Sequence, residues 1–245
     1  MRRRTLAVAA VPAAVVLATS AHAAGRRISP LTLVPARTPT FHVLRYETHG
    51  SYPQVRGAGL DLRAVNASLR AAVIAEQRAF APYARREKPT AASPDPGVFR
   101  TVIDRRYVSA STLVVSAMLP LTEEVFPGQN GGDTWLGMTV RVPSGVRVNV
   151  TDLFTDSQQG LRVLARASLH ALRRDARVCV SEYPFLSRPT VKNYSTFALT
   201  PSGLAVGFPE HAACYRLATT VPYAVLRPYL SKLGVALTAA VRHAR

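Results

Sequence analysis

The chain has 245 residues, of which 48% are hydrophobic and 18% are charged, a length that favours one compact domain with a substantial core. Its 31 Lys and Arg residues outnumber 14 Asp and Glu, for a formal net charge of +17, which attracts polyanions and disfavours basic partners. The sequence contains no G-x-S-x-G, H-E-x-x-H or P-loop pattern, which excludes the hydrolase, zinc-protease and nucleotide-binding classes that those motifs mark.

The first residues have the pattern of a secretory signal peptide. Arg2–Arg4 precede an apolar stretch, Leu6–Leu17, and an A-x-A motif ends at Ala23. We expect residues 1–23 to be removed by cleavage between Ala23 and Ala24, and the mature protein to be secreted. No later apolar run reaches about 18 residues, so no membrane anchor is expected.

Removal of the signal peptide leaves 28 basic against 14 acidic residues. Nucleic acid is not an expected partner of an exported chain without a nucleic-acid-binding motif. Anionic polymers of the cell wall and lipid head groups remain as candidates. The alternative is that the Arg content reflects the codon bias of a GC-rich bacterium and has no functional meaning.

The sequence has two cysteines, Cys179 and Cys214. An even count in an oxidising compartment predicts a disulfide between them, enclosing 34 residues. His211 and Cys214 faintly resemble the His-Gly-Cys-x-Arg signature of wall transpeptidases, but the Gly is missing and the spacing is one residue longer. Glu210 could join them as a zinc ligand, yet no second cluster completes a site. We therefore predict structural cysteines, with no catalytic residue, metal or cofactor.

The N-terminal part of the mature chain predicts a leader, a short strand and a helix. Residues 24–39 are rich in Pro and Arg without periodicity, so we predict a flexible leader and a domain over 40–245. A strand near 41–46 is followed by a turn at Ser51–Pro53. From Asp61 a helix is predicted to run to residues 81–82, with an apolar stripe formed by Leu62, Val65, Leu69, Val73 and Phe80.

The middle of the chain is rich in β-type residues. We predict four strands: 99–108, 112–119, 134–142 and 146–150. The first two are expected to pair antiparallel, a long loop over 123–133 follows them, and a turn at 143–145 joins the last two. Trp135 is predicted to lie in the core rather than to serve as an exposed binding anchor.

A second helix is predicted over 157–177, with Leu161, Leu164, Leu169 and Leu172 pointing inward. The opposite face carries a stripe of potential cations: Arg162, Arg166, His170, Arg173 and Arg177. Such a stripe could bind a polyanion, or it is simply the solvated face of an amphipathic helix.

The C-terminal part predicts a hairpin, residues 196–199 and 204–208, across the turn Thr200–Gly203. After the segment Tyr223–Tyr229, a last helix carries Leu230, Leu233, Leu237 and Val241 on one face. Helices and strands are mixed along the chain without a regular βαβ alternation. We therefore predict an α+β fold, a single domain with a mixed or antiparallel sheet packed against helices.

Several of these segments together resemble a known family. They are Tyr52–Val55 and Val65–Leu69 around the first helix, Val148–Phe154 before the second, Phe197–Phe208 in the hairpin, and Val221–Leu226. In this order and spacing they resemble the extracytoplasmic domain of unknown function shared by the anti-sigma factor RsiV and secreted mycobacterial immunogenic antigens, over about residues 40–232.

The resemblance implies a single α+β domain without enzymatic activity that, in the sensor proteins, binds a protein ligand. The sensor's signalling role does not carry over, because this chain has no transmembrane or cytoplasmic segment of that kind. We therefore expect a secreted binding domain for an unidentified protein ligand. The alternatives are a basic protein held by anionic cell-wall polymers and a Cys-dependent wall enzyme.

Overall fold

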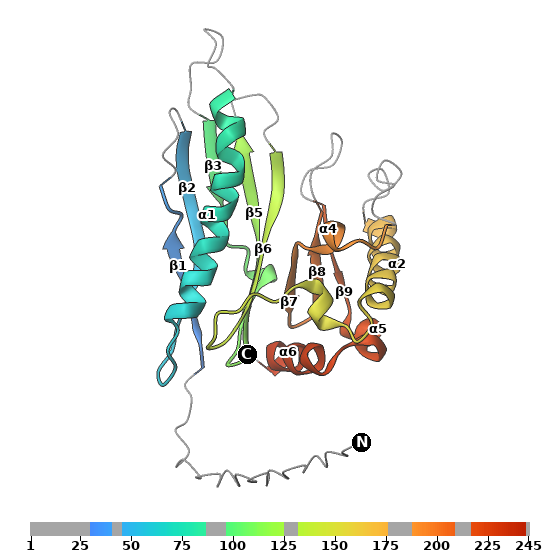
Figure 1. Cartoon of the computed structure of the whole chain (residues 1–245). Helices are drawn as coiled ribbons and strands as arrows, with labels where there is room; N and C mark the ends of the chain where they lie inside the picture. The colour runs from blue at the N-terminus through green and yellow to red at the C-terminus, as the bar shows by residue number, and fades with distance from the viewer. Residues whose placement is uncertain are drawn as a thin grey trace, which may run out of the picture.

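The computed structural model describes residues 30–40, 46–86, 97–124, 132–175, 188–208 and 217–243. Within them, two sheets lie side by side, with one long helix over the first and several helices around the second (Figure 1). The predicted signal peptide, including its cleavage site between Ala23 and Ala24, lies outside the described residues.

The first sheet has six strands: β1 (Thr32–Arg37), β2 (Tyr46–Arg56), β3 (Gly97–Thr101), β4 (Val108–Ala110), β5 (Val114–Glu124) and β6 (Gly132–Arg141). Their order is β1-β2-β3-β5-β4, and β6 also pairs with β5. β2 and β3 are parallel, whereas the other pairs are antiparallel. The sheet is therefore mixed, as predicted.

The helix α1 (Arg63–Arg86) covers one face of this sheet (Figure 1). All five residues of its predicted apolar stripe are buried, and they pack with sheet residues such as Phe99, Leu119 and Leu121. Asp61 begins the helix by accepting a hydrogen bond from the backbone N–H of Arg63 at 3.0 Å. The Arg63 side chain also donates to this carboxylate and holds the pKa of Asp61 down at about 2.

The predicted end of the first helix is wrong. Pro82 lies inside α1, which continues to Arg86. Proline removes the one N–H bond that would reach back to the preceding turn. Because Pro82 is exposed and Phe80 and Ala84 on either side of it are buried against the sheet, packing keeps the last turn helical.

The predicted leader over 24–39 is also wrong in its second half, because Thr32–Arg37 form strand β1 along β2. The register places Pro35 opposite Pro53, and neither has an N–H to donate. The residue pairs on either side of Pro35 and Pro53 maintain the pairing of β1 with β2. In addition, β1 is a terminal strand of the sheet, where proline is tolerated. The fold thus includes residues before position 40.

Two further strand predictions need correction. Ser51–Pro53 do not turn the chain but lie within β2, which keeps its direction past Gly50 at φ +89°. The predicted strand 99–108 is interrupted, because Asp104 accepts a hydrogen bond from the N–H of Arg106 and caps a 3-10 turn at Arg105–Tyr107. The predicted antiparallel pairing of this segment with the next strand is confirmed, because β3 and β4 both pair antiparallel with β5.

The second sheet has three antiparallel strands, β7 (Phe197–Thr200), β8 (Gly203–Gly207) and β9 (Ala218–Val221). The predicted hairpin is confirmed as β7 and β8, whereas β9 was not predicted. The predicted strand 146–150 is absent from the described structure: Arg147 forms an isolated bridge with Val140, and the chain then enters the 3-10 turn η2 (Val150–Leu153).

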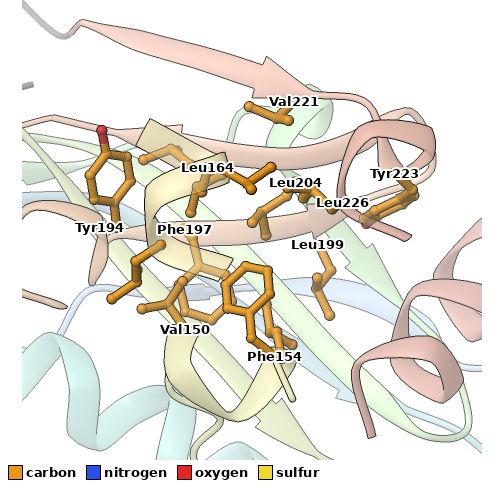
Figure 2. Close-up of a cluster of buried hydrophobic side chains, with 14 of the residues drawn as sticks. Val150, Phe154, Leu164, Tyr194, Phe197, Leu199, Leu204, Val221, Tyr223 and Leu226 are labelled. Atoms are coloured by element: carbon orange, nitrogen blue, oxygen red, sulfur yellow. The ribbon is translucent and has the colours of Figure 1, made fainter. Parts of the chain in front are cut away.

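The helices of the second half surround this sheet: α2 (Ser157–Asp175), α4 (Val191–Tyr194), α5 (Tyr223–Leu226), the 3-10 turn η4 (Arg227–Tyr229) and α6 (Lys232–His243). Their inner faces form one apolar cluster with the strands (Figure 2). In it Leu164 of α2 lies among Val150, Phe197 and Leu204. The last helix is confirmed as α6, with Leu237 and Val241 buried, but Leu230 lies before its first residue and forms an isolated bridge with Phe154.

Buried hydrogen bonds join the two sheets into one body. Ser116 of β5 bonds the hydroxyl of Thr139 and accepts from the N–H of Leu199 in β7, at 2.7 and 2.8 Å. Trp135 of β6 is buried, as predicted, and its indole N–H donates to the carbonyl of Leu217 at 3.1 Å. The molecule is a single α+β domain, and no helix in its described part is long and apolar enough to cross a membrane.

Candidate functional site

The helix α2 is held firmly against the second sheet. Its first turn is capped by Asp156, whose carboxylate accepts from the N–H groups of Gln158 and Gln159 at 2.9 and 3.0 Å. Gly160 allows close contact with Phe154, because a Cβ there would lie 2.1 Å from the Phe154 ring. Leu161, Leu164 and Leu172 are buried as predicted, while Leu169 is partly buried.

The opposite face of α2 carries a row of exposed basic side chains. We call Arg162, Arg166, His170, Arg173 and Arg174 the basic row of α2; all five are exposed. None takes part in an ion pair among the described residues, where the ion pairs are His49–Glu47, Arg63–Asp61 and Arg106–Asp104. Arg177, the last member of the predicted stripe, lies outside the described residues. Arg174 was not part of that stripe.

Both parts of the described chain are basic. Up to Arg141, 11 Lys and Arg face seven Asp and Glu, whereas from Val142 onward ten Lys and Arg face only three Asp. Arg147 packs beside α1 and β6, so each half of the described molecule carries a similar excess of positive charge. A field of this kind raises the local concentration of anions.

A groove of about 550 Å³ runs beside the basic row, between α2 and the segment from β9 to η4. On the α2 side its lining includes Arg166, His170 and Arg174. Its other residues are mostly apolar, and Val225 of α5 is 44% exposed. Sequence reasoning missed the groove, because its two walls are about 50 residues apart in the chain and meet only in the fold.

The far wall of the groove is fixed by a buried tyrosine. Tyr223, the first residue of α5, donates from its hydroxyl to the carbonyl of Thr200 at 2.9 Å. Burial raises the pKa of Tyr223, which keeps the hydroxyl protonated and donating. Leu226 on the same helix is buried in the core beside Tyr223 (Figure 2). This hydrogen bond and the buried side chains hold α5 in its position opposite α2.

The other predicted site residues are not brought together within the described structure. Cys179 and Cys214, with Glu210 and His211, lie outside the described residues, so the disulfide stays a prediction. In the part of the chain that is described, no group of three or more His, Cys, Asp or Glu side chains is placed to hold a metal ion.

Two carboxylic acids between α1 and the first sheet were not anticipated. Glu123, near the end of β5, has a buried Oε1 atom that receives no hydrogen bond. Burial raises the pKa of Glu123 to about 8, and repulsion from Glu76 of α1 adds to the shift. Burial also raises the pKa of Glu76, while the charge of Arg147 opposes that shift. We interpret the pair as a point where protonation is linked to folding, and not as a binding or catalytic site.

Comparisons with known proteins bear on the fold. No family model and no curated protein matches the sequence. Among solved structures, a DUF3298 family protein from Pseudomonas aeruginosa PAO1 is similar, with a TM-score of 0.51 and 12% identity over 84% of this chain and 95% of that chain. The chain has the fold of a DUF3298 protein.

A second DUF3298 family member, from Bacteroides fragilis NCTC 9343, has a TM-score of 0.46 and 14% identity over 88% of this chain and 98% of that chain. Both of these structural neighbours are members of a family of unknown function, as the resemblance in the sequence implied in general terms. At 12% identity, the likeness to the Pseudomonas protein shows the α+β fold alone, and the ligand of this chain has to be argued from its own surface.

Proposed function

We propose that this chain is an exported, non-enzymatic binding protein, comparable to the extracellular domain of RsiV, and that its ligand is an anionic polymer of the cell envelope. The basic row of α2 is the observation that carries the proposal. Its five side chains are exposed and have no acidic partner among the described residues. No ion pair with another described residue therefore has to break before one of them binds a ligand.

The row has a shape that suits a linear polyanion. Arg162 and Arg174 are twelve residues apart, which at about 1.5 Å per residue spans roughly 18 Å along the helix. Repeated anionic groups can contact successive side chains along this length, and each contact releases a counterion. A basic protein ligand is disfavoured by the same charges.

Charge reversal tests the proposal. The triple variant Arg162→Glu, Arg166→Glu and Arg173→Glu should weaken binding to purified anionic wall polymer by at least about tenfold, measured by co-sedimentation. Binding of the wild-type protein should also weaken steeply from 0.01 to 0.15 M salt, since the Debye length falls from about 30 to about 8 Å.

A matched control separates the row from net charge. Arg56, Arg70 and Arg78 are exposed on the other half of the molecule and form no ion pair with another described residue. Reversing these three to Glu changes the net charge equally and should leave most binding intact. Equal losses in both variants, or no loss in either, would mean that the basic row is only a solvated helix face.

A further inference from the structure

We propose that the groove between α2 and α5 holds the alkyl chain of an anionic lipid, whose phosphate head group contacts the basic row of α2. The proposal rests on the proposed function for its anion-binding row and adds the chemical class of the ligand. It is carried by the apolar walls of the groove, by the position of the cations along one rim, and by the absence of Asp and Glu from the described residues that line it.

The walls of the groove are apolar on both sides. Along α2 they are formed by Val163, Ala167 and Ala171, which recur every four residues and so share one face. Opposite them lie Val225 and Tyr229. Small residues on α2 leave room between the walls, and Val225 keeps a large apolar side chain 44% exposed. Covering such a surface with an apolar chain is favourable.

The cations follow the apolar wall at the same interval. Arg166, His170 and Arg174 each lie three residues after a member of the apolar wall, so they form a parallel row on the rim. Among the described residues that line the groove, none is Asp or Glu. A ligand with an anionic head and an apolar tail matches both rows, whereas a polar anion alone would leave Val225 in water.

The size of the groove agrees with this occupant. Its volume of about 550 Å³ lies within the range of roughly 300–1,000 Å³ typical of sites for small molecules. Thr220 of β9 adds a polar group to the lining between the walls. The groove is partly open to solvent, which allows an alkyl chain to lie in it while the head group stays in water.

A series of alkyl phosphates provides the test. Butyl, hexyl and octyl phosphate, used below their micelle concentrations, are titrated into the full-length mature protein and followed by calorimetry, with inorganic phosphate as the head group alone. A fully buried methylene tightens binding roughly fourfold. In an open groove we expect at least about twofold per methylene, or more than tenfold from butyl to octyl phosphate.

Two variants test where the alkyl chain of the ligand binds. Val225→Gln and Ala171→Phe, which make one wall polar or fill the space, should remove most of the dependence on chain length. Val191→Gln changes a valine of similar exposure, 48%, on α4 outside the groove, and should behave as wild type. An equal effect of Val191→Gln, or no effect of the two groove variants, would overturn the proposal.

The outcomes separate this proposal from the proposed function. If the wild-type protein binds wall polymer through the basic row but binds butyl and octyl phosphate equally, or neither, the lipid is overturned and the polyanion stands. If octyl phosphate binds tightly with the expected dependence on chain length while the triple charge reversal leaves polymer binding unchanged, the lipid stands and the polymer is overturned.

Discussion

Single side chains decide how the two sheets meet and where protonation matters. Ser116, Thr139 and Trp135 are buried, and each satisfies its polar atoms by bonds that cross between strands or sheets. Glu123 differs, because its buried Oε1 accepts no hydrogen bond from another described residue. A buried carboxyl without a partner is stable only when it is protonated.

Glu123 therefore predicts a loss of stability toward alkaline pH. Its pKa is raised from 4.5 in the unfolded chain to about 8 in the folded protein, so unfolding releases a proton between these values. The stability that this proton contributes is fully present below about pH 4.5 and is lost as pH rises through 8. Glu123→Gln stays neutral, so its free energy of unfolding should exceed that of the wild type by on the order of 2–4 kcal/mol above pH 8.

Urea denaturation from pH 5 to pH 9 measures this difference. The neighbouring substitution Glu124→Gln removes the same charge from the other face of β5 and should keep the pH slope of the wild type. Parallel slopes for Glu123→Gln and the wild type would contradict the assignment.

At the scale of the elements, periodicity identified the helices and failed for several strands. The apolar stripes of α1 and α6 and the inner leucines of α2 follow from local sequence, because a helix forms its backbone hydrogen bonds within itself. A strand depends on a partner elsewhere in the chain. Thr32–Arg37 have the composition of a linker, and they form β1 only because β2 offers an edge with Pro53 opposite Pro35.

The strand β1 is therefore expected to be part of the folded domain. A variant that begins at Thr40 lacks β1, and it loses both the β1–β2 ladder and the hydrogen bond between the hydroxyls of Thr38 and Thr101, 2.6 Å apart. Its free energy of unfolding should fall by a few kcal/mol relative to a variant that begins at Pro30. Thermal denaturation of the two truncated proteins compares them directly, and equal melting temperatures would restore the linker interpretation of this segment.

At the scale of the whole molecule, the protein is basic, and Lys and Arg outnumber Asp and Glu in both halves of the described chain. Long-range attraction therefore favours an anionic ligand in general. The exposed basic row of α2 beside the groove is the local feature that directs such a ligand there. These two observations are the reason that the proposed ligand, whether polymer or lipid, is anionic.

The intact mass of the mature protein tests both its predicted export and its predicted disulfide. Protein recovered from the culture medium of its producer should begin at Ala24. Its mass should be about two daltons lower than the mass calculated for the same chain with both thiols reduced, because Cys179 and Cys214 lose two hydrogens when they form a disulfide. Intact-mass spectrometry with and without a reductant measures both properties. Retained Met1 would contradict cleavage, and an unchanged mass on reduction would contradict the disulfide.

The sequence by itself determined the α+β class, the apolar stripes of the helices, the hairpin of β7 and β8, and the exposed cations of α2, because all of these depend on neighbours within a few residues. The tertiary structure decided the rest. It placed β1 beside β2, brought Val225 and Tyr229 to face α2, and buried Glu123 under α1. These features arise from contacts between distant segments, and periodicity along the chain carries no record of which segments meet.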